Sequence, residues 1–144
     1  MATKNRFNLT TSGGQTYGAG TYYLPALSPT AVTGSISGAY VEDMTKDLCI
    51  GFYMSGNAVL TFEATMEDPF TDQILPANVQ WIDVTLMTMP LNGAQAASFG
   101  GNGTFANIFD FGTLPFHKWR AKLVVTSSTV VRLVAQTGAS GTGY

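Results

Sequence analysis

Apolar and polar residues alternate along three parts of the chain, which is the pattern of β-strands with one buried face. In the first part, residues 48–54 and 58–64 each place every second side chain on one apolar face. Between them, Ser55, Gly56 and Asn57 are residues that favour a turn. The pattern therefore predicts a hairpin, with a buried face formed by Leu48, Ile50, Phe52, Met54, Ala58, Leu60, Phe62 and Ala64.

A strand over residues 79–87 is the second prediction. Trp81 falls on its outer face, either covered by a loop or exposed as a contact residue, because the indole is amphipathic. The side chains expected to point inward are Ile82, Val84 and Leu86, with Asp83 and Thr85 turned outward.

The third alternating part predicts a hairpin of residues 119–125 and 129–135 around a three-residue loop. Its inward residues would be Trp119, Ala121, Leu123, Val125, Thr129, Val131, Leu133 and Ala135. This register places Lys122 near Arg132. With Lys118 and Arg120 on the same outer face, it predicts a basic stripe.

Shorter segments at Arg6–Thr10, Thr21–Leu24 and Ala31–Val41 also favour strands, and no segment sustains a helical period of 3.6. About seven short strands with Gly, Pro and Ser turns predict an all-β, antiparallel β-sandwich of jelly-roll type. We expect one domain over residues 1–144, with an extended N-terminal arm (about 1–30) and a flexible C-terminal tail (about 137–144).

The segment Leu91–Thr113 is rich in glycine and contains four phenylalanines. A long loop of this kind inside a domain is usually functional or disordered, and the rings argue against disorder. Either the rings enter the chain's own core or the segment places them in a neighbouring molecule. We predict an interface formed by Phe99, Phe105, Phe109 and Phe111, together with Trp81, Lys118, Arg120, Lys122 and Arg132.

Charged residues make up only 11% of the chain, against about 25% in an average protein. This scarcity suggests that partner molecules cover much of the surface. The net charge of −2 gives no general attraction for nucleic acid, so the basic stripe would better suit a neighbouring subunit's carboxylates. Because the sequence shows no signal peptide and no long apolar span, we expect a soluble product made in a cytoplasm.

Residue types that carry catalysis are sparse. The one histidine, His117, lies in no nucleophile motif, and the acidic residues of the segment 67–72 do not match an EF-hand. Cys49 is flanked by apolar residues, which predicts a buried, inert thiol. We therefore expect no catalytic residue, no metal site and no cofactor.

The order of features resembles a known class of protein. An acidic loop is followed by Trp81-Ile82-Asp83-Val84-Thr85 and a glycine-rich excursion, and Leu114-Pro115-Phe116 then leads into Trp119–Val125. Over residues 34–136 this order is similar to that of small β-sandwich virion proteins of tailed bacteriophages. The nearest kind is the capsid decoration, or cement, protein.

The resemblance implies a non-enzymatic subunit that binds the major capsid protein on the outside of the phage head and stabilises the shell. It also implies a homotrimer located on the virion, made in the host cytoplasm, with no nucleic-acid or membrane partner. An alternative is a glycan- or receptor-binding module of a phage tail or spike, in which Trp81, Tyr40 or Tyr53 stacks on sugar rings. A weaker alternative is a β-sandwich enzyme with a carboxylate pair.

Overall fold

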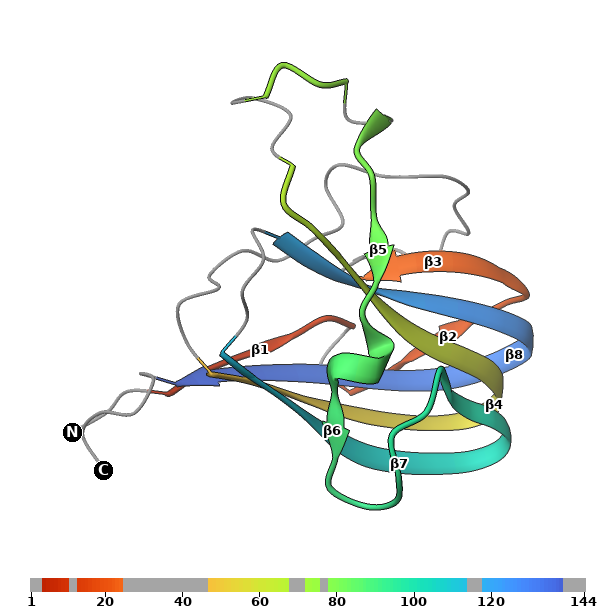
Figure 1. Ribbon diagram of the computed structural model, residues 1–144. Helices are drawn as coiled ribbons and strands as arrows, with labels where there is room; N and C mark the ends of the chain where they lie inside the picture. The colour runs from red at the N-terminus through yellow and green to blue at the C-terminus, as the bar shows by residue number, and fades with distance from the viewer. Residues whose placement is uncertain are drawn as a thin grey trace.

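A computed structural model describes residues 4–10, 13–24, 47–67, 72–75, 78–113 and 118–138. In this part of the chain, eight strands and one 3-10 turn form a single antiparallel sheet (Figure 1). The elements are β1 (Lys4–Asn8), β2 (Gln15–Tyr17), β3 (Gly20–Leu24), β4 (Asp47–Thr65), β5 (Ile82–Asp83), η2 (Thr85–Met87), β6 (Met89–Pro90), β7 (Phe99–Thr113) and β8 (Lys118–Gly138). The prediction of an all-β, antiparallel protein is confirmed.

Two long strands, β4 and β8, lie at the centre of the sheet and pair with each other from end to end. The other edge of β8 pairs with β1, β2 and β3 in succession. The other edge of β4 pairs with β7 and, near its C-terminal end, with β5. The short β6 then covers a small part of β7. All eight described strands thus belong to one open sheet.

The long strands double back on themselves. Phe99 and Phe109 are ten positions apart on β7, a span of about 33 Å in a straight strand. Their ring centroids are only 4.4 Å apart. On β4, Phe62 contacts the ring of Phe109, which pairs with Ile50 near the other end of the same strand. The sheet therefore folds into two facing layers, and the bend is visible where β4, β7 and β8 curve together in Figure 1.

The bend coincides with glycines and an irregular register. Gly56 of β4 pairs with Gly103 of β7, and both have positive φ, 144° and 122°. Beside them, β4 takes three steps from Ser55 to Ala58 while β8 takes five from Val130 to Val125. Extra residues of this kind bend a strand and increase its twist.

Between the layers lies one hydrophobic core, which includes the rings of Phe52, Phe62, Phe109 and Trp119. Of the residues assigned to the inward faces of β4 and β8, all are buried. Ile82 and Leu86 are exposed instead, and Val84 is only partly buried. The inward faces predicted from alternation on the long strands are therefore confirmed.

Both predicted hairpins are wrong. Residues 48–64 and 119–135 each belong to one continuous strand, and the residues predicted to form turns lie at the bend. The two halves of each strand do face the same core, as predicted. They meet across it as layers instead of pairing side by side.

The predicted N-terminal arm is also corrected for the part that the structure describes. Residues 4–8, 15–17 and 20–24 are strands of the sheet, so this part of the chain does not extend away from the domain. The strand predicted at Ala31–Val41 lies outside the described residues, as does the predicted tail beyond residue 138.

Replacing Gly56 by Ala tests the bend. A Cβ atom on Gly56 would clash with Thr129 Oγ1 and would lie 2.7 Å from the Thr129 Cα, whereas a Cβ atom on its partner Gly103 would have no atom within 4 Å. Both substitutions incur about 1–3 kcal/mol for a backbone conformation that residues other than glycine rarely adopt, and Gly56→Ala adds about 1–3 kcal/mol for overpacking. Urea unfolding should therefore show a clearly larger loss for Gly56→Ala than for Gly103→Ala. Equal losses would mean that the close approach at the bend does not matter.

Candidate functional site

The phenylalanines predicted to form an interface belong largely to the chain's own core. Phe99, Phe109 and Phe111 are buried, and Phe105 is partly buried against the same cluster. Phe111 packs edge-on against Phe62 at 4.9 Å, and Phe105 lies 5.5 Å from Phe52. The segment 99–113 is the strand β7 instead of a loop. The interface prediction is wrong for the three buried rings, and the alternative of a self-contained core is correct.

Residues 82–91 form a segment that crosses from one layer to the other. Ile82 pairs with Ala64 near the C-terminal end of β4, and Pro90 pairs with Phe109, opposite the N-terminal half of β4. In Figure 1 this green segment runs from β5 through the 3-10 turn to β6. We call residues 82–91 the bridging segment.

Hydrogen bonds of Thr85 end the strand β5 and stabilise the turn that follows it. Its hydroxyl donates to Asp83 Oδ1 at 2.7 Å and accepts from the Phe62 N–H at 2.9 Å. Its own N–H also donates to Asp83 Oδ1. Local bonds of this kind compete with regular strand pairing. The predicted strand over residues 79–87 therefore ends after Asp83, and Thr85 faces inward instead of outward.

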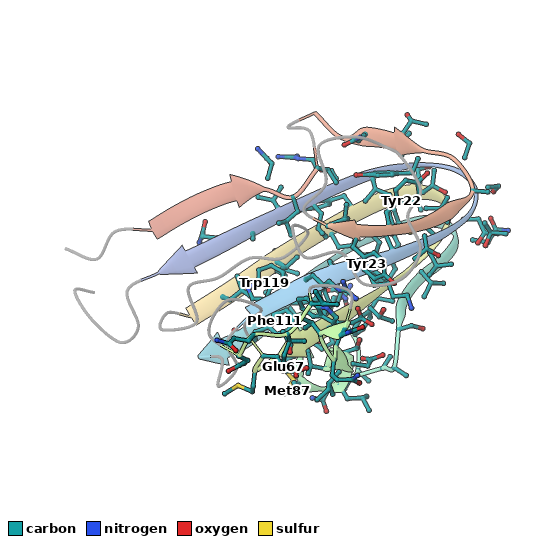
Figure 2. All side chains as sticks on the ribbon, turned by 90° about the horizontal axis from the view of Figure 1, so that it is seen from above. Tyr22, Tyr23, Glu67, Met87, Phe111 and Trp119 are labelled. Atoms are coloured by element: carbon teal, nitrogen blue, oxygen red, sulfur yellow. The ribbon has the colours of Figure 1, made fainter. Side chains whose placement is uncertain are left out.

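In the bridging segment, two polar side chains face the core and most of the apolar side chains face the solvent. Thr85 and Thr88 are buried with their hydroxyls hydrogen-bonded, while five apolar side chains point away from the core. These five, each 48–67% exposed, are Ile82, Leu86, Met87, Met89 and Leu91. We call them the apolar ridge; Figure 2 shows Met87 at the rim of the molecule. Sequence reasoning missed this surface because it assigned Ile82 and Leu86 to the core.

A hollow of about 460 Å³ adjoins the apolar ridge. Its lining is formed by Ile82, Asp83, Val84, Leu86, Met87 and Ala97. Three members of the ridge therefore gather around one concave surface, so the exposed apolar side chains are not scattered singly. Contiguous apolar patches on a protein surface mark interaction sites.

Arg120, predicted to lie in an exposed basic stripe, is only 2% exposed. Its Nε and Nη2 each donate to Glu63 Oε1 at 2.8 Å, and Glu63 is its cross-strand partner. The guanidinium carbon lies 3.9 Å from the ring centre of Tyr23 and 4.0 Å from that of Trp81. The buried Nη1 has no hydrogen-bond partner among the described residues. Trp81 and Arg120 thus stabilise each other within the chain.

The predicted basic stripe does not form as expected. Lys122 pairs with Thr61 and Arg132 with Tyr53, so these two cations lie on opposite sides of the bend of β8. Lys118 begins β8, but its side chain is outside the described part. Arg132 lies over the outer face of β4, 5.7 Å from the Tyr53 ring centre.

Several other predictions concern chemistry. Cys49 is partly exposed instead of buried, with its Sγ 4.0 Å from Asp110 Oδ1. His117 and most of the acidic segment 67–72 lie outside the described residues. Among the residues that are described, no three His, Cys, Asp or Glu side chains group as metal ligands would. The same part of the chain has no helix long and apolar enough to cross a membrane.

Comparison with known proteins gives no relative. No family model matches the chain, and neither a curated protein nor a solved structure matches it. The function is therefore argued from the surfaces described above.

The Glu63–Arg120 pair makes a prediction about stability. Removing one partner of a buried ion pair typically costs about 3–5 kcal/mol, because a charge is left without compensation. Glu63→Gln should thus destabilise the protein strongly. The double variant Glu63→Gln/Arg120→Met should recover a large part of that loss in urea unfolding. If the two single effects simply add, the pair does not act as a unit.

Proposed function

We propose that this protein is a non-enzymatic structural subunit that decorates the outer surface of a tailed-bacteriophage head, where it binds the major capsid protein and stabilises the shell. The observation that supports this proposal best is the apolar ridge. It presents exposed Leu, Ile and Met side chains, while Thr85 and Thr88 of the same segment are buried.

The inverted polarity favours a protein partner. Exposing five large apolar side chains next to one another is unfavourable in water, and their burial on association is favourable. Two of the five are methionines, whose flexible, polarisable side chains adapt to irregular protein surfaces. The low charge of the chain reduces the desolvation of ionic groups when such a surface is covered.

A capsid is the partner that combines these properties with the resemblance found in the sequence. When subunits are linked in an oligomer, several modest surfaces can bind a repeated lattice together and gain in overall affinity. The sheet holds the bridging segment at both ends, because β5 pairs with β4 and β6 pairs with β7.

The proposal includes the finer fold type and the oligomeric state. The two facing layers with a shared core support a β-sandwich of the kind found in decoration proteins, reached here through one continuously paired sheet. A homotrimer on the virion surface, as in that class, would repeat the ridge around a threefold axis.

Charges placed on the apolar ridge test the binding surface. Leu86→Glu/Met89→Glu should weaken co-sedimentation with purified phage heads by at least about tenfold, since a buried carboxylate without a partner is costly. The matched control is Val124→Glu/Val130→Glu, which adds the same charge at exposed apolar positions of β8. Circular dichroism and the unfolding midpoint establish that both variants fold. Equal loss of binding in both variants would contradict a specific role of the ridge.

The oligomeric state can be measured separately. Multi-angle light scattering of the purified protein, and its copy number on saturated heads, should both fit multiples of three. A strict monomer in solution and on the particle would contradict the proposed trimer. It would not contradict binding to the head.

A further inference from the structure

A second surface lies on the outer face of the sheet, away from the core. Gly51 of β4 lies in a row between Ile108 of β7 and Val134 of β8. Because glycine has no side chain, the row has a depression at its centre. The depression is a hollow of about 170 Å³ lined by Cys49, Gly51, Tyr53, Ile108, Arg132, Val134 and Gln136. That is room for several water molecules or one six-membered ring.

Tyr53 and Arg132 form one end of this hollow, which we call the outer-face hollow. They are direct cross-strand partners, and the guanidinium lies 5.7 Å from the tyrosine ring centre. The Tyr53 ring leans over Gly51, since a Cβ atom on that glycine would lie 3.1 Å from Tyr53 Cε2. Tyr53 is nevertheless 40% exposed. An aromatic face is therefore presented beside a cation.

The charge of Arg132 has no counterpart among the described residues. No carboxylate pairs with it there, and its buried Nε has no hydrogen-bond acceptor. Asp110 contacts one lining residue of the hollow, Cys49, and its Oδ1 accepts the Gly112 N–H at 2.8 Å. Arg120 of the same strand differs, because it forms an ion pair with Glu63.

A second depression continues the first. It has a volume of about 280 Å³ and shares Tyr53 and Ile108 with the outer-face hollow. Its remaining lining is Leu91, Asn92, Ala106 and Asn107. The Asn107 side chain already has hydrogen-bond partners within the chain. Its Nδ2 donates to the Asn92 carbonyl, and its Oδ1 accepts the Ile108 N–H. Because the two depressions share Tyr53 and Ile108, consecutive units of an oligomeric ligand could contact both.

We propose that the outer-face hollow binds an acidic saccharide, with the sugar carboxylate on the Arg132 guanidinium and the sugar ring against Tyr53. Arginine binds carboxylates through two parallel hydrogen bonds, which makes it selective for this group. The apolar face of a sugar ring suits an exposed aromatic ring, and the amide of Gln136 supplies a partner for hydroxyl groups. The outer-face hollow itself contains no residue of the apolar ridge, although the second depression that adjoins it includes Leu91. The saccharide proposal does not depend on the decoration proposal.

The experiment is protein-observed ¹⁵N NMR on the full chain with three probes. These are a trimer of galacturonic acid, the neutral trimer maltotriose, and acetate at the same carboxylate concentration. The acidic trimer should shift the Gly51 and Tyr53 amides and the Arg132 Nε–H saturably. Maltotriose should bind at least about tenfold more weakly, since it lacks the group that arginine recognises. Acetate should leave the Tyr53 signals unchanged.

Variants separate the roles of the residues. Arg132→Gln should weaken binding of the acidic trimer by at least about tenfold, because the charge-assisted bonds are lost. Tyr53→Leu should do the same, whereas Tyr53→Phe, which keeps the ring, should retain binding. Gly51→Ala should also weaken it, since the new methyl group fills the floor and displaces the tyrosine ring. Val124→Thr, an exposed change elsewhere on β8, is the control.

Three results would overturn the proposal. The first is a titration that does not saturate at the highest soluble concentration of the acidic trimer. The second is an affinity for maltotriose equal to that for the acidic trimer. The third is chemical-shift changes with acetate equal to those with the acidic trimer. Unchanged binding in Arg132→Gln that still gives a dispersed spectrum would also overturn it. Head co-sedimentation of Arg132→Gln should equal that of the unaltered protein, so failure of this site is distinguishable from failure of the decoration function.

Discussion

Phe62 can contact both Phe109 and Phe111 only because the long strands double back at the same point along their length. Most of the core is built from residues of one sheet facing each other across this bend. A β-strand resists sharp bending unless residues without side chains, or extra residues, relieve the strain. Gly56, Gly103 and the two additional residues of β8 supply that relief side by side. The two layers, and the bridging segment between them, follow from this constraint.

Much of the fold was predictable because a period of two identifies the buried face of a strand whatever its partner. The inward residues of β4 and β8 were identified correctly for this reason. The strand pairing was not identified correctly. A three-residue turn and a continuous bent strand place the same alternating residues on the inward face, so alternation does not distinguish them. Residues 55–57 and 126–128 satisfy both interpretations. Only contacts between distant segments distinguish them, and these are not encoded in local periodicity.

The surfaces were harder to predict than the core. Alternation assigned Ile82 and Leu86 to the interior. The hydrogen bonds of Thr85 with Asp83 and with the Phe62 N–H instead turn Thr85 inward and leave Ile82 and Leu86 exposed. The pairing of Asp83 with a threonine two residues later was the available signal, yet such pairs are common in turns. Arg120 was predicted to lie in an exposed basic stripe at an interface, but it is buried against Glu63, Tyr23 and Trp81 of the same chain. A charge pattern shows which face a residue occupies but not what covers it.

The position of β8 has a consequence for how the protein reaches its fold. Four other strands pair with β8, and it is the last described element of the chain: Lys4 pairs with Gly138, and Asp47 pairs with the same residue. During synthesis, β1, β2 and β3 therefore cannot pair with β8 until residues 118–138 have left the ribosome. Non-local pairing of this kind makes folding slow and leaves strand edges open to other chains in the meantime. A nascent population of this protein should thus depend on chaperone protection more than its modest size suggests.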